Sequence, residues 1–377
     1  MPFYDDTRSP CPFGHGVCFL RGECTLSLAN IALVDTLRTQ HTLTDGEFVR
    51  LLTTDDAEMR SALRNAAAEV RHQHFGNQVY LRGLIELTNY CKNNCYYCGI
   101  RRDNHHAKRY RMTEAEVLDC VKNGREMGFC TFVLQGGEDA YFTDARLIAL
   151  IGCIKEIAPN AAVTLSLGER SRASYAALKK AGADRYLLRH ETATDAHYHQ
   201  LHPAEMSLAN RRQCLADLKS LGYQTGCGMM VGSPYQKVEH LVADLRYIAA
   251  LQPEMVGIGP FLPHHDTPFA AAQAGSADMT LRLLSIVRLM LPQVLLPATT
   301  ALGTLIPDGL EQGILSGANV IMPNLTPCTV RGNYLLYDGK DTAAKDTVDL
   351  LEERRKRFAA IGYEIVHHRG DAPNHSV

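Results

Sequence analysis

Three closely spaced cysteines are the residues of this sequence best suited to chemistry. Cys91, Cys95 and Cys98 form a C-x₃-C-x₂-C array. A structural zinc ion takes four protein ligands, and the only nearby residues that could complete such a set are His105 and His106. Three thiolates without a fourth ligand suit a [4Fe–4S] cluster in which one iron stays open to a cofactor or substrate. The array therefore favours an iron–sulfur cluster, with zinc as the alternative.

The array directly follows a β-rich run at Val79–Thr88, the first of eight such runs. The others are Thr131–Leu134, Ala162–Ser166, Arg185–Leu188, Gln224–Val231, Met255–Ile258, Leu295–Thr299 and Asn319–Met322. The helix-length segments between them are Thr113–Met127, Asp144–Ile157, Arg172–Ala181, Ser207–Leu221, Lys237–Leu251, Thr280–Leu291 and Gly309–Leu315. Parallel strands need crossover connections of this kind. The alternation predicts an α/β fold with a closed (β/α)₈ TIM-type barrel.

Polar or glycine-rich residues follow most of the expected strands. They include Gln135-Gly136-Gly137-Glu138, Ser166-Leu167-Gly168-Glu169, Arg189-His190-Glu191-Thr192, Pro260-Phe261-Leu262-Pro263-His264, Thr299-Thr300 and Pro323-Asn324. Barrel active sites lie at the C-terminal ends of the strands, so we expect these residues to meet at one mouth. The alternative for any single one of them is an ordinary loop residue. His264-His265-Asp266 could bind a metal, although a hydrogen-bonding role in the loop is favoured.

The segments before and after the expected barrel are predicted to be mainly helical or irregular. We expect residues 1–28 to form a poorly ordered N-terminal extension, 29–77 a helical cap, 78–340 the barrel, and 341–377 a C-terminal helix and tail. Cys11, Cys18 and Cys24 could bind a metal with His15, but incidental thiols are favoured there. The remaining cysteines on expected helices and strands are predicted to be small core residues, namely Cys120, Cys130, Cys153 and Cys214.

Composition excludes several classes of protein. The chain has 377 residues, 46% of them hydrophobic and 21% charged, which is typical of a folded globular protein. Its net charge of −2 argues against binding to nucleic acid or anionic lipid. The sequence contains no apolar run of about 18 residues and no export signal, so we expect a cytoplasmic protein outside the membrane. Twelve cysteines in this length are too sparse for a disulfide scaffold.

A C-x₃-C-x₂-C array after the first strand of a βα-repeat barrel resembles the radical S-adenosylmethionine (SAM) superfamily. Tyr97 matches that family's aromatic position near the adenine, and Gln135-Gly136-Gly137-Glu138 resembles the motif that meets the SAM amino group. Glycines there permit close backbone approach. The resemblance implies that the three cysteines bind one [4Fe–4S] cluster and that SAM chelates its open iron. An electron from the cluster would then split SAM to give a 5′-deoxyadenosyl radical.

Longer strings between about Ala29 and Lys340 resemble the HydE family of [FeFe]-hydrogenase maturases. These strings are Leu87–Cys91, Cys98–Asn104, Arg109–Thr113, Thr164–Glu169, Ala183–Thr192, Val256–Phe261, Pro297–Ala301 and Asn319–Asn324. Some members of that family carry a second, peripheral cluster bound by three C-terminal cysteines. Only Cys328 lies beyond Cys227 here, so we expect that second cluster to be absent.

The family resemblance implies roles for particular residues. Ser166, Glu191, Arg211 and Tyr334 would contact SAM, with Glu191 on the ribose and Arg211 on the carboxylate. Thr164, Arg189, Met322 and Tyr337 would line the substrate end of the barrel, and Thr299 and Thr300 an anion site deeper in it. Arg189 also stands out independently, because an inward charge in a barrel needs an anionic partner. The alternative is an internal ion pair with Glu191 or Glu169.

The expected function is therefore that of a radical SAM enzyme in assembly of the [FeFe]-hydrogenase active-site cluster. By resemblance, its substrate is a small sulfur-containing iron complex, and its partners are other hydrogenase maturases and an external electron donor. Two other functions stay open. One is a biotin-synthase-like or methylornithine-synthase-like enzyme acting on a carbon substrate, and the other is a non-enzymatic iron–sulfur electron carrier.

Overall fold

The structure, a computed structural model, describes the backbone of residues 16–340 and 347–373. Side chains are described for residues 28–340 and 348–373. Its centre is a six-stranded parallel sheet in the order β2 (Gly83–Thr88), β3 (Thr131–Gly136), β4 (Ala162–Ser166), β5 (Arg185–Leu187), β6 (Gln224–Val231) and β7 (Met255–Pro260). Every position of β2, β6 and β7 is buried, as expected for strands covered on both faces.

Isolated parallel bridges close the sheet into a barrel. Leu295 bridges to Met255 of β7, Pro297 bridges to Val320 of β8 (Val320–Ile321), and Asn324 bridges back to Leu84 of β2. The α/β fold and the (β/α)₈ TIM-type barrel are thus confirmed. The expected seventh strand, Leu295–Thr299, is reduced to these bridges. Pro297 has no N–H to donate to a ladder, which explains the short pairing.

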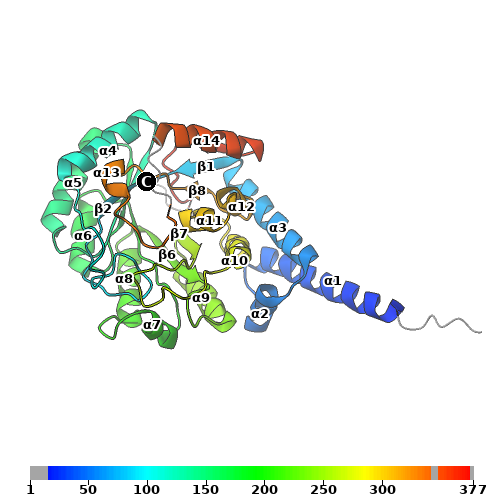
Figure 1. Ribbon diagram of the computed structural model, residues 1–377. Helices are drawn as coiled ribbons and strands as arrows, with labels where there is room; N and C mark the ends of the chain where they lie inside the picture. Colours follow the sequence, from blue (N-terminus) through cyan, green and yellow to red (C-terminus); the bar gives the residue numbers. More distant parts are fainter. Residues whose placement is uncertain (1–15, 341–346, 374–377) are drawn as a thin grey trace, which may run out of the picture.

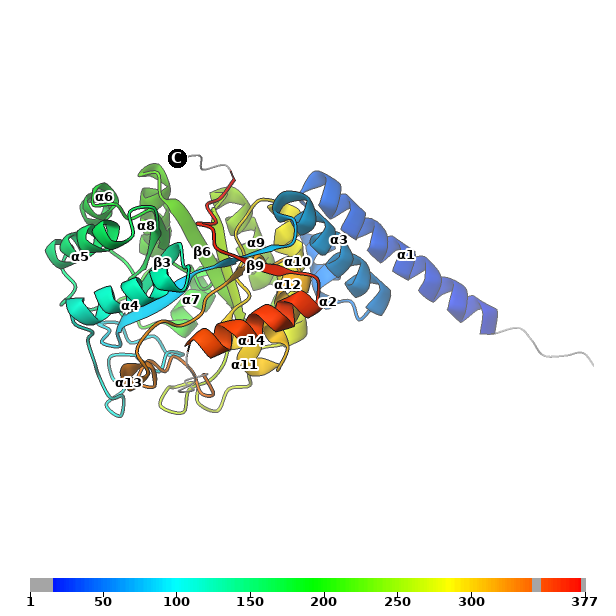
Figure 2. The ribbon, with the colours of Figure 1, turned by 90° about the horizontal axis from the view of Figure 1, so that it is seen from above.

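The first expected strand, Val79–Thr88, is divided at Arg82. Its second half is β2, whereas its first half is β1 (Gln78–Leu81), which pairs with β8 and with β9 (Glu364–Val366) in a separate three-stranded sheet. The first strand of the chain and a strand near the C-terminal end of the described residues therefore lie side by side, as Figure 2 shows for β1 and β9.

Helices surround the strands in an arc (Figure 1). Those that match expected segments are α4 (Glu114–Glu126), α5 (Asp144–Ile157), α6 (Arg172–Lys180), α8 (Leu208–Ser220), α9 (Val238–Leu251), α10 (Ala277–Met290) and α12 (Gly309–Leu315). Three short helices and a C-terminal one add to these: α7 (Asp195–Leu201), α11 (Thr300–Leu305), α13 (Cys328–Arg331) and α14 (Thr347–Ala360). The N-terminus of α4 is fixed by a capping box in which Thr113 and Glu116 satisfy each other's backbone N–H groups.

Three further helices precede the barrel and lie to one side of it (Figure 1). They are α1 (Gly16–Gln40), α2 (Asp45–Thr53) and α3 (Ala57–Phe75), and α3 packs against both α1 and α10. Helix α1 begins well before the expected start at Ala29, so residues 16–28 are helical rather than part of an irregular extension. Cys11 and His15, and the side chains of Cys18 and Cys24, lie outside the described residues.

The C-terminal segment packs against the N-terminal ends of the barrel strands. Asp371 Oδ1 accepts hydrogen bonds of 2.7 Å from both Arg185 Nη2 and Gln224 Nε2. Arg185 is fully buried, so this carboxylate supplies its charged partner. Among the described helices, none is long and apolar enough to cross a membrane.

Candidate active site

A cavity of about 310 Å³ opens at the C-terminal ends of the strands. Fifteen residues predicted from the sequence line it: Cys91, Cys95, Tyr97, Cys98, Gln135, Gly136, Gly137, Glu138, Ser166, Arg189, Glu191, Arg211, Thr299, Tyr334 and Tyr337. These residues come from five strand ends, one helix and the segment after β8, yet they share a single mouth. The convergence expected for a barrel active site is therefore present.

Three other predicted residues do not line this cavity. Thr164 is buried within β4, and Met322 packs beside a small apolar cluster that includes Phe75. Thr300 begins α11 and lines a neighbouring cavity of about 450 Å³. The hydroxyls of Thr164 and Thr299 are both buried without a hydrogen-bond partner among the described residues. Of these two, Thr299 lines the cavity, so its hydroxyl is free to bind a ligand there.

The three cysteine thiols line one cavity but are too far apart for one metal ion. Among the described residues, the group of potential ligand atoms within 4.8 Å of one another is formed by His264, His265 and Asp338. Sulfurs on a single tetrahedral zinc would lie only about 3.8 Å apart. Within the described part of the chain, Cys91, Cys95 and Cys98 do not form such a group, so their sulfurs are not arranged around one zinc ion.

Burial also makes the three cysteine thiols harder to deprotonate. It raises the pKa of Cys91 and Cys95 and raises the pKa of Cys98 to about 12. For Cys95 and Cys98, the neighbouring thiols and Glu191 raise the pKa further. Thiolates in this pocket therefore need a strongly positive partner, and bound iron provides one. The residues present thus fit an iron–sulfur cluster.

Arg109 holds the loop that carries the cysteines. Its guanidinium donates to the backbone carbonyls of Asn89, Ile100 (2.9 Å), Arg101 (2.6 Å) and Asn104 (3.0 Å). These carbonyls lie on both sides of the array. One side chain therefore closes the loop and satisfies carbonyls that have no ladder partners.

The segment after β3 packs tightly against the cysteine loop. A Cβ atom on Gly137 would lie 2.2 Å from the carbonyl oxygen of Tyr90 and 2.7 Å from Cys91 Cβ, so only glycine fits there. Glu138 N donates to Cys91 Sγ at 3.4 Å, and Glu138 Oε1 accepts from Glu169 N at 3.0 Å. Glu138 thus connects the cysteine loop to the loop after β4.

Two ion pairs cross the cavity wall. Arg189 Nη2 lies 3.1 Å from Glu191 Oε2, and Arg211 Nε donates to Glu169 Oε1 at 2.6 Å. Arg211 also donates to the carbonyl of Arg189 at 2.6 Å. The internal pair considered for Arg189 is therefore present, although neither atom of that contact has hydrogen-bond geometry.

Glu191 adopts an unusual backbone conformation. Its φ of +66° lies in the left-handed region, which costs a non-glycine residue about 1 to 3 kcal/mol. Its N–H donates to Gly228 O at 3.0 Å and its carbonyl accepts from Met230 N at 3.4 Å, so neighbouring β6 holds this conformation. Strain of this kind is typical of functional positions.

The comparisons with known proteins agree with this geometry. Residues 85–248 match the radical SAM superfamily. The chain is 46% identical to the [FeFe] hydrogenase maturase subunit HydE of Thermotoga maritima over 77% of this chain and 82% of that protein. The chain belongs to the HydE family of radical SAM enzymes.

More distant relatives share the fold. The chain is 30% identical to 3-methylornithine synthase of Methanosarcina barkeri over 82% of this chain and 89% of that protein. The crystal structure of methylornithine synthase (PylB) superposes with a TM-score of 0.76 at 26% identity, covering 89% of this chain and 97% of that one. The maturase HydG superposes with a TM-score of 0.77 at 19% identity, covering 94% and 80% of the two chains. As a radical SAM enzyme, the protein uses a [4Fe–4S] cluster and SAM.

Sequence reasoning missed the residues that support Tyr97 in this radical SAM barrel. The Tyr97 hydroxyl lies 3.1 Å from His202 Nε2, and His202 Nδ1 lies 2.9 Å from the carbonyl of Tyr198. The rings of Tyr198 and His202 stack with centroids 3.9 Å apart. No sequence pattern indicates this arrangement, because it depends on a ring stack and a backbone carbonyl.

The pair His264-His265 lies at the rim of the same mouth and makes hydrogen bonds. His265 Nδ1 lies 2.7 Å from Asp338 Oδ1, and His264 Nδ1 accepts from Asp266 N at 3.0 Å. The Nδ1 atoms of both rings therefore make hydrogen bonds with protein groups, as the hydrogen-bonding role favoured from the sequence predicts.

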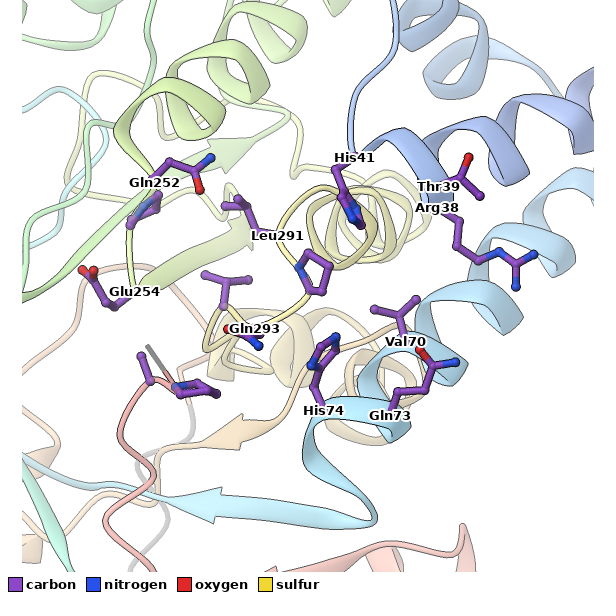
Figure 3. A pocket seen from close by; sticks show the side chains of 15 residues that line it. Arg38, Thr39, His41, Val70, Gln73, His74, Gln252, Glu254, Leu291 and Gln293 are labelled. Carbon is purple, nitrogen blue, oxygen red and sulfur yellow. The ribbon is translucent and has the colours of Figure 1, made fainter. Parts of the chain in front are cut away.

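A second cavity of about 610 Å³ lies away from the cysteines. Figure 3 shows His41 and Arg38 at the end of α1 facing His74 and Gln73 at the end of α3, with Gln252 and Glu254 opposite. It contains none of the predicted site residues.

Proposed function

We propose that this protein acts as a HydE-type maturase in assembly of the [FeFe]-hydrogenase active-site cluster. The observation that carries the proposal is the mouth of the barrel, where three cysteines and the anion-binding side chains Arg189 and Arg211 share one cavity. The 46% identity to HydE over most of both chains supports the same function. The substrate would be a small sulfur-containing iron complex.

We assign the cluster to Cys91, Cys95 and Cys98. When bound, the cluster supplies the electron that splits SAM into methionine and a 5′-deoxyadenosyl radical. The carbonyls of Gln135–Glu138 and the side chain of Ser166 would accept hydrogen bonds from the SAM ammonium group, and the Arg211 guanidinium would bind its carboxylate. Glu191 would accept from the ribose hydroxyls, and Tyr97 and Tyr334 would enclose the nucleoside and exclude water.

The substrate would bind on the far side of SAM from the cysteines. Arg189, Thr299 and Tyr337 line that part of the cavity, and the free hydroxyl of Thr299 can donate to an anion. Thr164, Thr300 and Met322 would support this region from behind the lining. The Arg189 guanidinium and the free Thr299 hydroxyl favour an anionic substrate over a neutral hydrocarbon.

The protein would work in the cytoplasm with other hydrogenase maturases and an external one-electron donor as partners. Nucleic acid and membrane are not expected as partners, since the net charge is −2 and no described helix could span a bilayer.

The first prediction tests the assignment of the cysteines. After anaerobic reconstitution, Cys95→Ala should bind substantially less iron and lose SAM cleavage by at least about 100-fold, because a thiolate ligand is removed. Iron counting, electron paramagnetic resonance (EPR) and 5′-deoxyadenosine analysis measure this. Cys328→Ser is the matched control, since Cys328 is exposed and lies outside the cavity lining. Cleavage by Cys95→Ala at the wild-type rate would refute the assignment.

The maturase role needs its own readout. Hydrogenase apoprotein should stay inactive in an extract from a strain lacking this gene and recover on addition of the wild-type protein but not of Cys95→Ala. A fully active hydrogenase in the deletion strain would exclude the role. Transfer of deuterium from a labelled amino acid to 5′-deoxyadenosine, without any need for an iron complex, would favour the methylornithine-synthase-like alternative.

A further inference from the structure

The segment that follows β8, residues 324–340, crosses the mouth of the barrel. Asn333 O accepts from Asn89 Nδ2 at 2.7 Å, and Leu336 O accepts from Gly99 N at 2.9 Å, so the segment is bound to both ends of the cysteine loop. Asp338 N donates to Pro263 O at 2.9 Å on the loop after β7. This segment carries Tyr334 and Tyr337 into the cavity lining.

A buried ion pair holds the end of this segment inside the barrel. Lys340 Nζ donates to Glu86 Oε1, and the exposed fractions of the two side chains are 7% and 0%. Glu86 lies in β2, and its other carboxylate oxygen accepts from Asn324 Nδ2 at 3.0 Å. The same carboxylate therefore binds the start and the end of the segment.

Lys340 also contacts Tyr334 directly. Its ammonium group donates to the Tyr334 carbonyl at 2.7 Å and lies 4.6 Å from the centre of the Tyr334 ring. On its other side, the Tyr334 hydroxyl accepts from Gln135 Nε2 at 3.3 Å. Tyr334 is only 2% exposed and is thus fixed between β3 and the ion pair.

Stability alone does not explain a pair in this position. Burial raises the pKa of Glu86 and lowers that of Lys340, so each charge is costly there. Buried pairs of this kind are often replaceable by apolar residues without loss of stability, whereas removal of one partner is strongly destabilising. What apolar residues cannot supply is the hydrogen bond to the Tyr334 carbonyl and the cation beside its ring.

We propose that Glu86 and Lys340 are positioning residues that hold Tyr334 against SAM and fix the closed path of residues 324–340 over the cavity. The proposal rests on the function proposed above, in which Tyr334 contacts SAM. Neither residue lines the cavity itself, so both act through Tyr334 rather than on the reacting atoms.

The test compares a single and a double variant of the reconstituted holoenzyme. Lys340→Met leaves Glu86 buried and unpaired, and should lower the unfolding midpoint and raise the KM for SAM about 10-fold. Glu86→Gln/Lys340→Met removes both charges, and should recover most of the midpoint while the KM stays raised. Lys340→Arg, which keeps a cation, should restore part of the SAM affinity. Thermal unfolding, SAM-cleavage kinetics and the change in the cluster EPR spectrum on adding SAM give the readouts.

A second lysine offers a matched control far from the mouth. Lys155 Nζ also bridges a carboxylate and a carbonyl, donating 2.8 Å hydrogen bonds to Asp184 Oδ2 and to Ala161 O at the opposite end of the barrel. Lys155→Met/Asp184→Asn should leave the KM for SAM unchanged. Equal KM values in the wild type and the Glu86→Gln/Lys340→Met variant would overturn the proposal. Failure of the wild type to cleave SAM would instead overturn the function on which it rests.

Discussion

At the scale of single residues, Glu191 at the barrel mouth has a backbone conformation that costs conformational free energy. Its left-handed backbone is maintained from β6 and from behind the strand, where Asp244 Oδ1 accepts from Ala193 N at 2.5 Å and lies 3.3 Å from His190 Nε2. His190 and Asp244 are fully buried, so this support is separated from solvent. The left-handed conformation of Glu191 therefore has a local cost in stability, which the surrounding contacts offset.

Glu191→Gly should separate these two effects. Glycine adopts positive φ freely, so the unfolding midpoint should stay level or rise by a few degrees, whereas SAM affinity should fall at least about 10-fold with loss of the carboxylate. Thermal unfolding and SAM-cleavage kinetics of the holoenzyme measure both. Glu191→Ala serves as the control, because it removes the carboxylate but keeps the backbone cost. A destabilised Glu191→Gly protein with normal SAM kinetics would contradict this interpretation.

At the scale of elements, regular patterns were predictable and short or interrupted ones were not. The bounds of α5 agree with the sequence expectation, because 14 residues of apolar periodicity and the N-cap residue Thr143 define this helix. Helices α7, α11 and α13 have seven, six and four residues, which is too short for a periodic signal. The break at Arg82 and the bridged segment at Pro297 depend on pairing partners distant in sequence.

In the site, cysteines and strand-end residues were predictable, whereas Arg109 and His202 act through backbone carbonyls and stacking that sequence does not display.

The end of α7 leads to a prediction about pH. Burial lowers the pKa of His202 to about 3, whereas an unfolded histidine titrates near 6.5. Between these values the unfolded chain binds more protons than the folded one, so stability falls as the pH decreases below about 6.5. At pH 5.5 this loss is about 1 kcal/mol relative to pH 7.5. His202→Gln should show a smaller change in unfolding midpoint between these pH values, whereas exposed His105→Gln should keep the wild-type change. Identical pH profiles for all three proteins would disprove the role of His202.

At the scale of the whole molecule, the C-terminal segment covers the N-terminal end of the barrel. Strand β9 adds to β1, and Arg369 and Asp371 reach Arg185 and Asp184 at the N-terminal ends of the strands. The sequence did not predict β9, because its three residues carry no period and pair with a strand almost 290 positions earlier. Such long-range closure follows from packing of the complete fold.

Removal of the Asp371 carboxylate should therefore destabilise the protein without altering its chemistry. Asp371→Ala leaves Arg185 buried without its acidic partner, which should cost about 3 kcal/mol and lower the unfolding midpoint. Asp371→Asn, which keeps an acceptor, should cost less. At low temperature both variants should cleave SAM with wild-type KM, since Asp371 lies at the opposite end of the barrel. A large rise in KM with an unchanged midpoint would contradict this.

The Arg185–Asp371 contact also affects how small molecules could enter and leave the barrel. With polar side chains filling the rear of the barrel, small molecules would have a single doorway, at the front beneath residues 324–340. Methionine and nucleoside would then leave by the route through which SAM enters. A reactive species formed within would meet its target before it could escape through the back.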